Sequence, residues 1–113
     1  MSDCIFCKII NGELPSKNVY RDEQIVAFHD IAPAAPTHIL IVPVQHIESV
    51  NTMTDADEKL IGRLFTTAKG IAEKEGLSER GYRLVVNTNA EAGQTVFHLH
   101  LHLLGGRQLR AMG

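Results

Sequence analysis

The sequence predicts an α+β protein: an antiparallel sheet of about five strands with one long and one short helix. Short strand-like segments come first, one long amphipathic segment follows, and two more strand-like segments come after it. Because strands and helices do not alternate one by one, a helix packed on one face of an antiparallel sheet is favoured over a parallel βαβ arrangement. No repeat or linker interrupts residues 1–113, so we expect a single domain.

A short helix is expected first, because four apolar residues share one face at helical spacing: Ile5, Phe6, Ile9 and Ile10. Asp3 is the expected N-cap of this helix, since aspartate accepts hydrogen bonds from the first turn. Asn11-Gly12 ends it, and Pro15 follows shortly after.

Three strands are expected next. Two short ones lie at residues 18–21 and 24–28, with a turn at Asp22-Glu23 between them. The third, at residues 38–42, is apolar and largely β-branched, and Pro43 ends it.

The long helix is expected to begin at Thr54, a good N-cap that precedes several acidic residues suited to the positive end of a helix. Gly76 marks its end. Its apolar face repeats at helical spacing and consists of Leu60, Ile61, Leu64, Phe65, Ala68, Ile71 and Ala72.

The last two strands are expected at residues 82–88 and 95–104, with Gly105-Gly106 ending the second. They are separated by a short loop, so we expect them to pair as a hairpin.

Three histidines alternate with apolar residues in the segment from Phe97 to Leu104. Side chains of a strand point alternately to its two faces, so His98, His100 and His102 are expected on one face. Phe97 and the leucines are expected on the other face, under the long helix. A solvent-facing amphipathic strand is the simplest alternative, but histidine is a weak strand former, and strict alternation of three is improbable by chance.

Two chemical interpretations of the histidines compete. Zinc is one, but His98 and His102 stand about 13 Å apart along a strand, so three histidines on a single ion are disfavoured and a two-histidine pair stays open. Metal-free phosphoryl chemistry is the other. A neutral imidazole attacks phosphorus through Nε2 if Nδ1 holds the proton, while a neighbouring histidine donates hydrogen bonds to the phosphate oxygens. We favour the second.

The segment from His98 to Leu104 resembles the alternating motif that names the histidine triad family. The ending at residues 104–108 is similar to the nucleoside phosphoramidase branch rather than to the dinucleoside polyphosphate hydrolase branch. Other stretches resemble family segments in the same order along the chain: residues 4–10, 27–31, 35–40, 82–87 and 93–97.

The resemblance implies the fold of that family and a hydrolase acting on purine nucleoside 5′-phosphoramidates and acyl-adenylates. His100 of the triad would attack the α-phosphorus, and water would then release the 5′-monophosphate. His102 and Asn87 would contact the α-phosphate, and Asp30 would bind the ribose hydroxyls. Gly93 and Gln94 would lie near the phosphate. The resemblance also implies a wall around the purine base made of Ile5, Phe6, Ile9, Phe28, His29, Ile31 and Leu40.

Two further residues come from the same resemblance. Thr95 stands where serine is commonest in the family, and its hydroxyl would bond to the phosphate or to the leaving amine. His38 resembles an upstream histidine that supports His100, and a purely structural role for His38 stays open.

The pair Cys4 and Cys7 leaves three interpretations open. A redox pair lacks the surrounding βαβ pattern, and two thiols in a small helix are the simplest reading. A zinc half-site would need two more ligands. The resemblance supplies His46 and His98, because matching residues hold a structural zinc in some bacterial members. Catalysis itself would need no cofactor.

The partners expected are a purine nucleotide and a second copy of the chain, with the sheet continued across a homodimer as in the family. The net charge of −2 argues against nucleic acid or a membrane surface as a partner. No export signal or membrane span is recognisable, which indicates a cytoplasmic protein. A dinucleoside polyphosphate hydrolase and a nucleotide-binding sensor are the rival functions.

Overall fold

A computed structural model describes residues 3–112, so residues 1, 2 and 113 of the expected domain lie outside the described part of the chain. Five strands form one antiparallel sheet in the order β1-β2-β3-β5-β4, which confirms the α+β prediction. The strands are β1 (Asn18–Arg21), β2 (Ile25–His29), β3 (Thr37–Pro43), β4 (Arg83–Val85) and β5 (Leu101–Gly105). The helices are α1 (Ile5–Ile10) and α2 (Glu58–Lys74), with short 3₁₀ turns at Val50–Thr52, Asp55–Asp57 and Ala90–Ala92.

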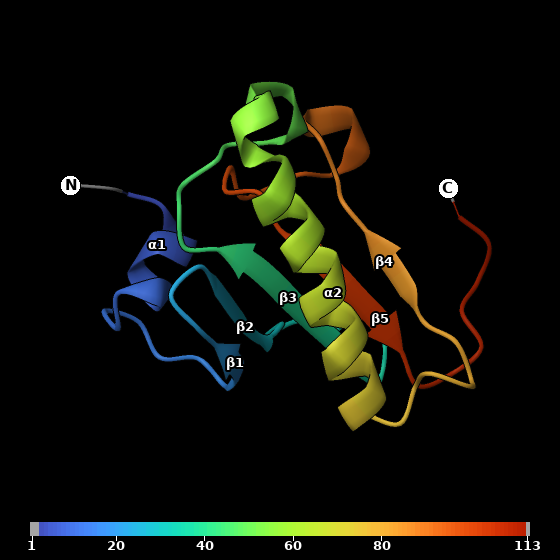
Figure 1. Ribbon diagram of the computed structural model, residues 1–113. Coiled ribbons are helices and arrows are strands. Elements are labelled where there is room, and N and C mark those ends of the chain that lie inside the picture. Colours follow the sequence, from blue (N-terminus) through green and yellow to red (C-terminus); the bar gives the residue numbers. More distant parts are fainter. Residues whose placement is uncertain (1–2, 113) are drawn as a thin grey trace.

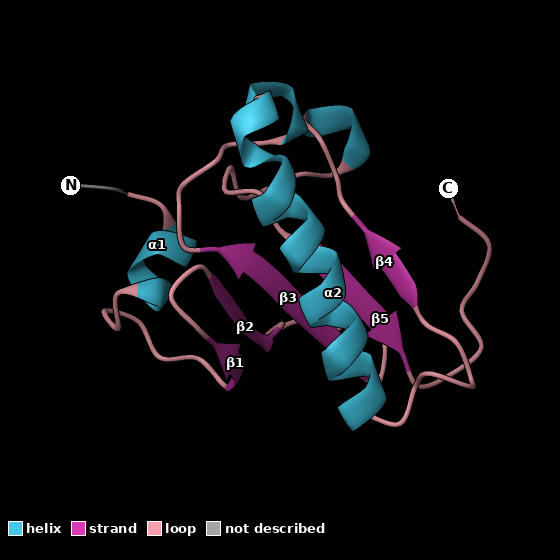
Figure 2. Cartoon of the chain, in the orientation of Figure 1, coloured by secondary structure: helices cyan, strands magenta, loops and turns pink. Residues whose placement is uncertain are grey.

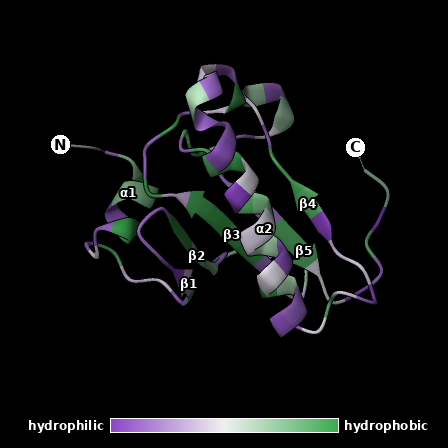
Figure 3. Ribbon diagram, viewed as in Figure 1, coloured by the Kyte–Doolittle hydropathy of each residue, from purple (hydrophilic) through white to green (hydrophobic). Residues whose placement is uncertain are grey.

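Helix α2 crosses one face of the sheet over β3 and β5, whereas α1 lies near the β1–β2 end (Figures 1 and 2). Alternate residues of β2 and β3 point to opposite faces, as strand geometry requires. The face under α2 forms the larger core, and Figure 3 shows hydrophobic residues on the strands beneath the helix. Its members include Ile25, Ala27, Ile39, Ile41, Leu101 and Leu103 of the sheet and Leu64, Ala68, Ile71 and Ala72 of α2.

The other residues of the same strands form a second, smaller core with α1. This core unites Val26, Phe28, Leu40 and Val42 of the sheet with Phe6 and Ile10 of α1. It lies on the face opposite α2, because each of its strand residues neighbours one that belongs to the α2 core. The sheet thus lies between two layers, the larger core under α2 and the smaller core that contains α1.

Both helices begin differently from the prediction. Cys4, not Asp3, is the N-cap of α1, and its Sγ accepts a hydrogen bond from the backbone N–H of Cys7. The helical segment after Thr54 starts as a 3₁₀ turn, in which the Asp57 carboxylate accepts from the Thr54 N–H at 3.0 Å, and α2 proper starts at Glu58. Asn11 ends α1, as predicted.

The predicted strands at residues 82–88 and 95–104 are too long. Strand β4 spans Arg83–Val85 and β5 spans Leu101–Gly105, and the two pair in antiparallel fashion as expected. Strand β5 starts at Leu101 because β3 cannot donate a hydrogen bond to the residues before it. Ile41 of β3 faces Leu101, so residue 99 stands opposite Pro43, which has no N–H. His98 and His100 therefore precede the strand rather than lie on it. No helix of the described residues is long and apolar enough to cross a membrane.

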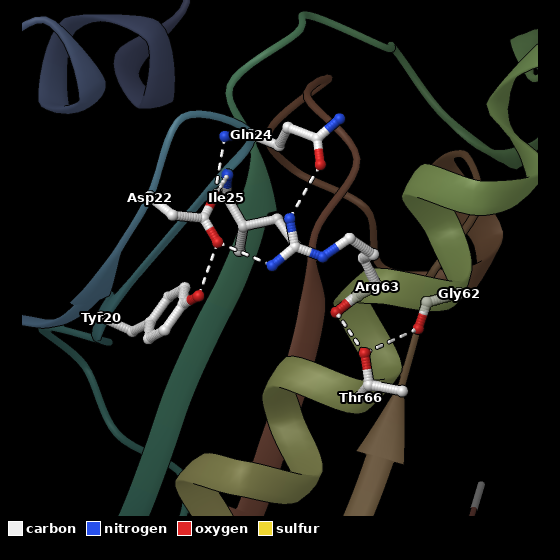
Figure 4. A network of polar contacts seen from close by, with 7 residues as sticks. All are labelled: Tyr20, Asp22, Gln24, Ile25, Gly62, Arg63 and Thr66. Atoms are coloured by element: carbon white, nitrogen blue, oxygen red, sulfur yellow. Dashed lines mark hydrogen bonds and ion pairs between the residues drawn. The ribbon is translucent and has the colours of Figure 1, made fainter.

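A polar network ties the β1–β2 turn to α2 (Figure 4). The Asp22 carboxylate accepts hydrogen bonds from the Tyr20 hydroxyl at 2.5 Å and from the backbone N–H groups of Gln24 and Ile25 at 2.8 and 2.9 Å. Arg63 of α2 adds an ion pair at 2.7 Å. Desolvation raises the pKa of Asp22, but the hydrogen bonds from Tyr20, Gln24 and Arg63 outweigh it and hold that pKa well below its usual range.

We expect Asp22→Asn to lower the free energy of unfolding by about 1 kcal/mol at pH 7, because charge-assisted bonds at a partly exposed site become neutral ones. The folded-state pKa of Asp22 is depressed, so this contribution is complete above about pH 5 and fades as the pH falls. Urea unfolding at pH 7 and pH 3 measures both effects. Glu23→Gln, on the same turn, is the control, and a difference that persists undiminished at pH 3 would contradict the assignment.

Candidate active site

The α1 side of the sheet brings the three triad rings together. His102 of β5 faces Leu40 of β3, so its side chain shares the sheet face that α1 covers. The ring of Phe6 stands edge-on to His100, with ring centres 5.0 Å apart, and His100 in turn lies 4.9 Å from His102. The ring of His98 also lies beside that of Phe6, with ring centres 6.0 Å apart. The expectation that three imidazoles share one side is confirmed, although only His102 lies on a strand.

Local backbone fixes the protonation of His100. Its Nδ1 lies 2.7 Å from the carbonyl oxygen of His98, and a carbonyl can only accept. Nδ1 therefore carries the proton, and Nε2 retains a lone pair. Burial lowers the pKa of His100, although the His98 carbonyl and Asp30 act in the opposite direction. The ring is thus a neutral imidazole at pH 7 with its nucleophilic nitrogen unprotonated.

A chain of hydrogen bonds fixes the tautomer of His102. The backbone N–H of Ala34 donates to Nδ1 of His38 at 3.0 Å, so the proton of neutral His38 resides on Nε2. That Nε2 lies 2.9 Å from Nδ1 of His102, and 3.5 Å from the Asp30 carboxylate. His102 Nδ1 therefore accepts, and His102 Nε2 carries a proton. Nε2 is buried without a hydrogen-bond partner among the described residues, and the ring lines a cavity, so this N–H lacks an acceptor that a ligand could supply.

His38 and His102 both stay uncharged at neutral pH. Burial lowers the pKa of His38, with the Asp30 carboxylate acting against it. Burial, together with the neighbouring His100 and His38 rings, lowers the pKa of His102 to about 4. Neutral rings keep the relay of donors and acceptors described above intact.

A cavity of about 240 Å³ opens in front of these rings. It adjoins a wider hollow of about 650 Å³, and the two share five lining residues: Pro15, Ser16, His29, Asp30 and Ile31. Together they are within the size range of small-molecule sites. The smaller cavity has both apolar and polar lining residues, which are Ile5, Phe6, Ile9, Pro15, Ser16, Phe28, His29, Asp30, Ile31, Leu40, Thr95, Val96, His100 and His102.

Eleven of the sixteen residues predicted for catalysis or nucleotide binding line this cavity. His38 lines only the adjoining wider hollow, and four others line neither space: Asn87, Gly93, Gln94 and His98. The buried Gln94 amide donates to the Glu48 and Val96 carbonyls at 2.8 and 3.2 Å, and its oxygen accepts from the Asn89 N–H at 2.7 Å. Gln94 thus shapes the loop before the triad rather than facing the cavity.

Two predicted placements are wrong. His38, expected behind His100, hydrogen-bonds to His102 instead. Phe97, expected under α2, is 48% exposed, because residues 95–100 leave the strand geometry on which the alternation depends. His98 is fully buried and is absent from the cavity lining.

Three contributors to the site were not predicted from the sequence. Pro15 and Ser16 line the cavity, although Pro15 is read from the sequence only as a helix breaker. The backbone N–H of Ala34 sets the tautomer of His38, and no sequence signal identifies such a contact.

Four residues form a second cluster behind α1: Cys4, Cys7, His46 and His98, with all ligating atoms within 4.8 Å of one another. His98 Nδ1 lies 3.4 Å from Cys4 Sγ, 3.5 Å from Cys7 Sγ and 3.2 Å from His46 Nδ1, and Cys7 Sγ lies 3.4 Å from His46 Nδ1. The edges of a tetrahedral zinc site with nitrogen and sulfur ligands are about 3.3–3.8 Å, so the geometry fits zinc. His98 Nε2 donates to the Pro43 carbonyl at 2.8 Å, which leaves Nδ1 unprotonated toward the cluster.

The two tautomers are measurable. Long-range ¹H–¹⁵N spectra of labelled protein at pH 7 are expected to show His100 protonated on Nδ1 and His102 on Nε2. His102 is expected to remain neutral until about pH 4, because burial lowers its pKa. Free histidine in the same sample serves as the reference, and a His102 resonance that titrates beside it would contradict the assignment.

Comparison with known proteins places these features in a family. The HIT domain model matches residues 11–109. The chain is 53% identical over 110 residues to the purine nucleoside phosphoramidase of Escherichia coli K12, covering 97% of this chain and 92% of that protein.

Two solved structures are also similar. A HIT family hydrolase from Legionella pneumophila Philadelphia 1 matches with a TM-score of 0.94 and 53% identity, covering 96% of each chain. A histidine triad protein from Clostridium difficile matches with a TM-score of 0.96 and 40% identity, covering 100% of this chain and 98% of that one. With its three clustered imidazoles and these similarities, the chain belongs to the HIT domain family, the histidine triad proteins.

Proposed function

We propose that the protein is a purine nucleoside phosphoramidase, which cleaves the P–N bond of purine nucleoside 5′-phosphoramidates and also acts on acyl-adenylates. The observation that carries the proposal is a pair of neutral imidazoles at one cavity: His100 with an unprotonated Nε2 and His102 with an unpartnered Nε2–H. The 53% identity to an E. coli enzyme of that name supports the same reaction.

In the first step His100 Nε2 attacks the α-phosphorus, and the P–N bond to the amine breaks. The electron pair of that bond goes to the amine nitrogen, which gains a proton, and a nucleotidyl-histidine remains. His102 Nε2–H donates to a phosphate oxygen, and this bond strengthens as negative charge gathers there. His38 holds His102 in the donating tautomer.

In the second step water adds to phosphorus, and the bond between phosphorus and His100 breaks. Its electron pair returns to Nε2, which regenerates the neutral ring. One water is consumed over the two steps: its hydroxyl ends on the nucleoside 5′-monophosphate and its remaining proton balances the one taken up by the amine. The His98 carbonyl, fixed on Nδ1 at 2.7 Å, favours the imidazolium character of the intermediate.

The remaining cavity residues are proposed to bind the nucleoside. Oδ1 of Asp30 accepts a hydrogen bond from the Ala32 N–H, and Oδ2 lies 3.5 Å from His38 Nε2. Oδ2 would accept hydrogen bonds from the ribose hydroxyls. The apolar lining residues of the cavity would hold the purine. Asn87 and Gly93 stay predicted phosphate contacts, and the wall for the base consists of Ile5, Phe6, Ile9, Phe28, His29, Ile31 and Leu40.

We expect His100→Ala to reduce the turnover of adenosine 5′-phosphoramidate by at least about 10³-fold, because it removes the nucleophile. Mass spectrometry of wild-type protein mixed briefly with substrate is expected to reveal an adenylyl adduct on His100. Binding of AMP by the variant is the control for an intact fold.

Two outcomes would argue against the proposal. An adduct on another residue, or full turnover by His100→Ala, would exclude His100 as the nucleophile. Hydrolysis of dinucleoside polyphosphates with no action on phosphoramidates would favour the rival hydrolase.

We propose further that the Cys4, Cys7, His46 and His98 cluster holds a structural zinc. The measured edges of the cluster and the hydrogen bond from His98 Nε2 to Pro43 support it. A bound zinc would crosslink α1 to the segments that carry His46 and His98, and the four protein ligands would leave no position for substrate. Hydrolysis would then need no metal.

Elemental analysis of the purified protein is expected to find about one zinc per chain. Cys7→Ser should lose most of that zinc and lower Tm by about 5–10 °C, since metal binding contributes to folding. Lys8→Ser, at the next residue of α1, is the matched control. A zinc content near zero after refolding with added zinc would contradict the site, and lost activity in chelated but folded protein would contradict its structural role.

A homodimer is the last part of the proposal. Strand β4 is at one end of the sheet order, so its outer edge has no partner strand among the described residues. Phe65 of α2 is 42% exposed. An interface that uses β4 and the outer face of α2 would continue the sheet into the second copy and cover Phe65.

A further inference from the structure

A second hollow, of about 430 Å³, lies directly beside the cavity that holds His100. The two share three lining residues: Ile5, Thr95 and Val96. Of the proposed base wall only Ile5 also lines the second hollow, and Asp30, His100 and His102 do not line it. The two spaces therefore meet at Ile5, Thr95 and Val96.

The second hollow has a distinct chemical character. Two carboxylates line it, those of Asp3 and Glu48, beside Cys4 and His46 of the thiol–imidazole cluster, and no lysine or arginine does. The exposed ring of Phe97 forms another part of its wall, next to the apolar side chains of Ile5 and Val96. Carboxylates and an aromatic face both attract cations, whereas the apolar part suits a hydrocarbon stem. Core packing does not explain the exposure of Phe97, whereas contact between its ring and a cationic ligand would.

Displacement at phosphorus sets the direction in which the amine leaves. The attacking and departing groups stand roughly in line across the phosphorus atom. With the nucleoside in the apolar cavity and His100 as attacker, the amine has to depart toward a part of the site that neither occupies. The second hollow, which shares Thr95 with the cavity of His100, is such a part of the site.

We propose that this second hollow is the leaving-group subsite, and that it selects amines carrying a second, cationic end on a short aliphatic stem. The proposal rests on the phosphoramidase function and specifies its substrate class. The stem would lie against Ile5, Val96 and Phe97, and the cationic end would be held between Phe97 and the carboxylates of Asp3 and Glu48. Amines that end in a methyl group would gain only the apolar contact, and those that end in a carboxylate would be repelled.

The preference is expected to be moderate, because both carboxylates are exposed to solvent. Interactions of exposed charges are weak one at a time, so two of them plus the Phe97 face predict a three- to tenfold advantage in kcat/KM. The advantage should shrink as salt is added, since salt screens exposed charges.

The test compares AMP phosphoramidates of 1,5-diaminopentane and n-hexylamine, which differ by one ammonium in place of a methyl group. The phosphoramidate of 5-aminopentanoate supplies the anionic case, and adenosine 5′-phosphoramidate, which releases ammonia, reports the basic reaction. We expect kcat/KM to fall from the ammonium to the methyl to the carboxylate compound. The double variant Asp3→Asn/Glu48→Gln should reduce the advantage of the ammonium compound to below about twofold and leave the ammonia reaction within about twofold, whereas Glu79→Gln should leave the ranking unchanged.

A second measurement keeps binding separate from turnover. Calorimetry with His100→Ala and the unreactive AMP esters of 5-aminopentanol and n-hexanol is expected to show the same preference for the ammonium ligand. Equal affinities and equal rates for all end groups, or a ranking that survives in the double variant, would overturn the subsite. Failure to hydrolyse adenosine 5′-phosphoramidate would instead overturn the phosphoramidase function, and the calorimetric comparison would still decide whether the hollow binds a cation.

Discussion

The pairing of β3 with β5 is the constraint on which the rest of the molecule depends. Its register places Ile39 and Ile41 beside Leu103 and Leu101 on the side of α2, where they form the larger core. The same register turns His102 to the opposite side, next to Leu40. A shift by one residue would bury His102 under α2 and expose the leucines. The apolar core and the position of the site are therefore fixed by the same hydrogen bonds.

Chemistry at this site depends on burial combined with one well-placed hydrogen bond for each ring. Burial keeps His38, His100 and His102 uncharged, and a backbone group then decides which nitrogen of the ring holds the proton. For His100 the deciding group is the carbonyl of His98, and for His38 it is the N–H of Ala34. Backbone groups do not vary with side-chain identity, so the assignment of tautomers depends on the path of the chain rather than on further polar residues.

Much of the fold was predictable, because it follows from periodicity. The apolar spacing of α2 and the β-branched run of β3 identify both elements, and the proline after that run predicts the end of β3 to within one residue. The end of regular structure before Leu101 was not predictable, since it depends on Pro43 standing opposite in a neighbouring strand. The same local effect moved Phe97 to the surface. Alternation in a sequence indicates a strand only as far as a partner strand extends.

The candidate site divides in the same way. Residues within the histidine motif and its related segments, such as Asp30 and Thr95, were predicted and do line the cavity. Contacts between segments far apart in the chain were not predicted. The bond from His38 to His102 spans 64 positions, and the backbone contact of Ala34 depends on how the loop before β3 folds back.

Helix α1 has only six residues, too few for a helix to persist by itself in water. It exists because of its neighbours: Phe6 packs against the triad rings on one side, and Cys4 and Cys7 contact His98 on the other. The conformational entropy lost when α1 becomes ordered is therefore offset by contacts on both of its sides. Thermodynamic linkage then makes the effect reciprocal. If a nucleotide that orders α1 raises the affinity of the thiol–imidazole cluster for its metal by some factor, a metal bound in the cluster raises the affinity for the nucleotide by the same factor.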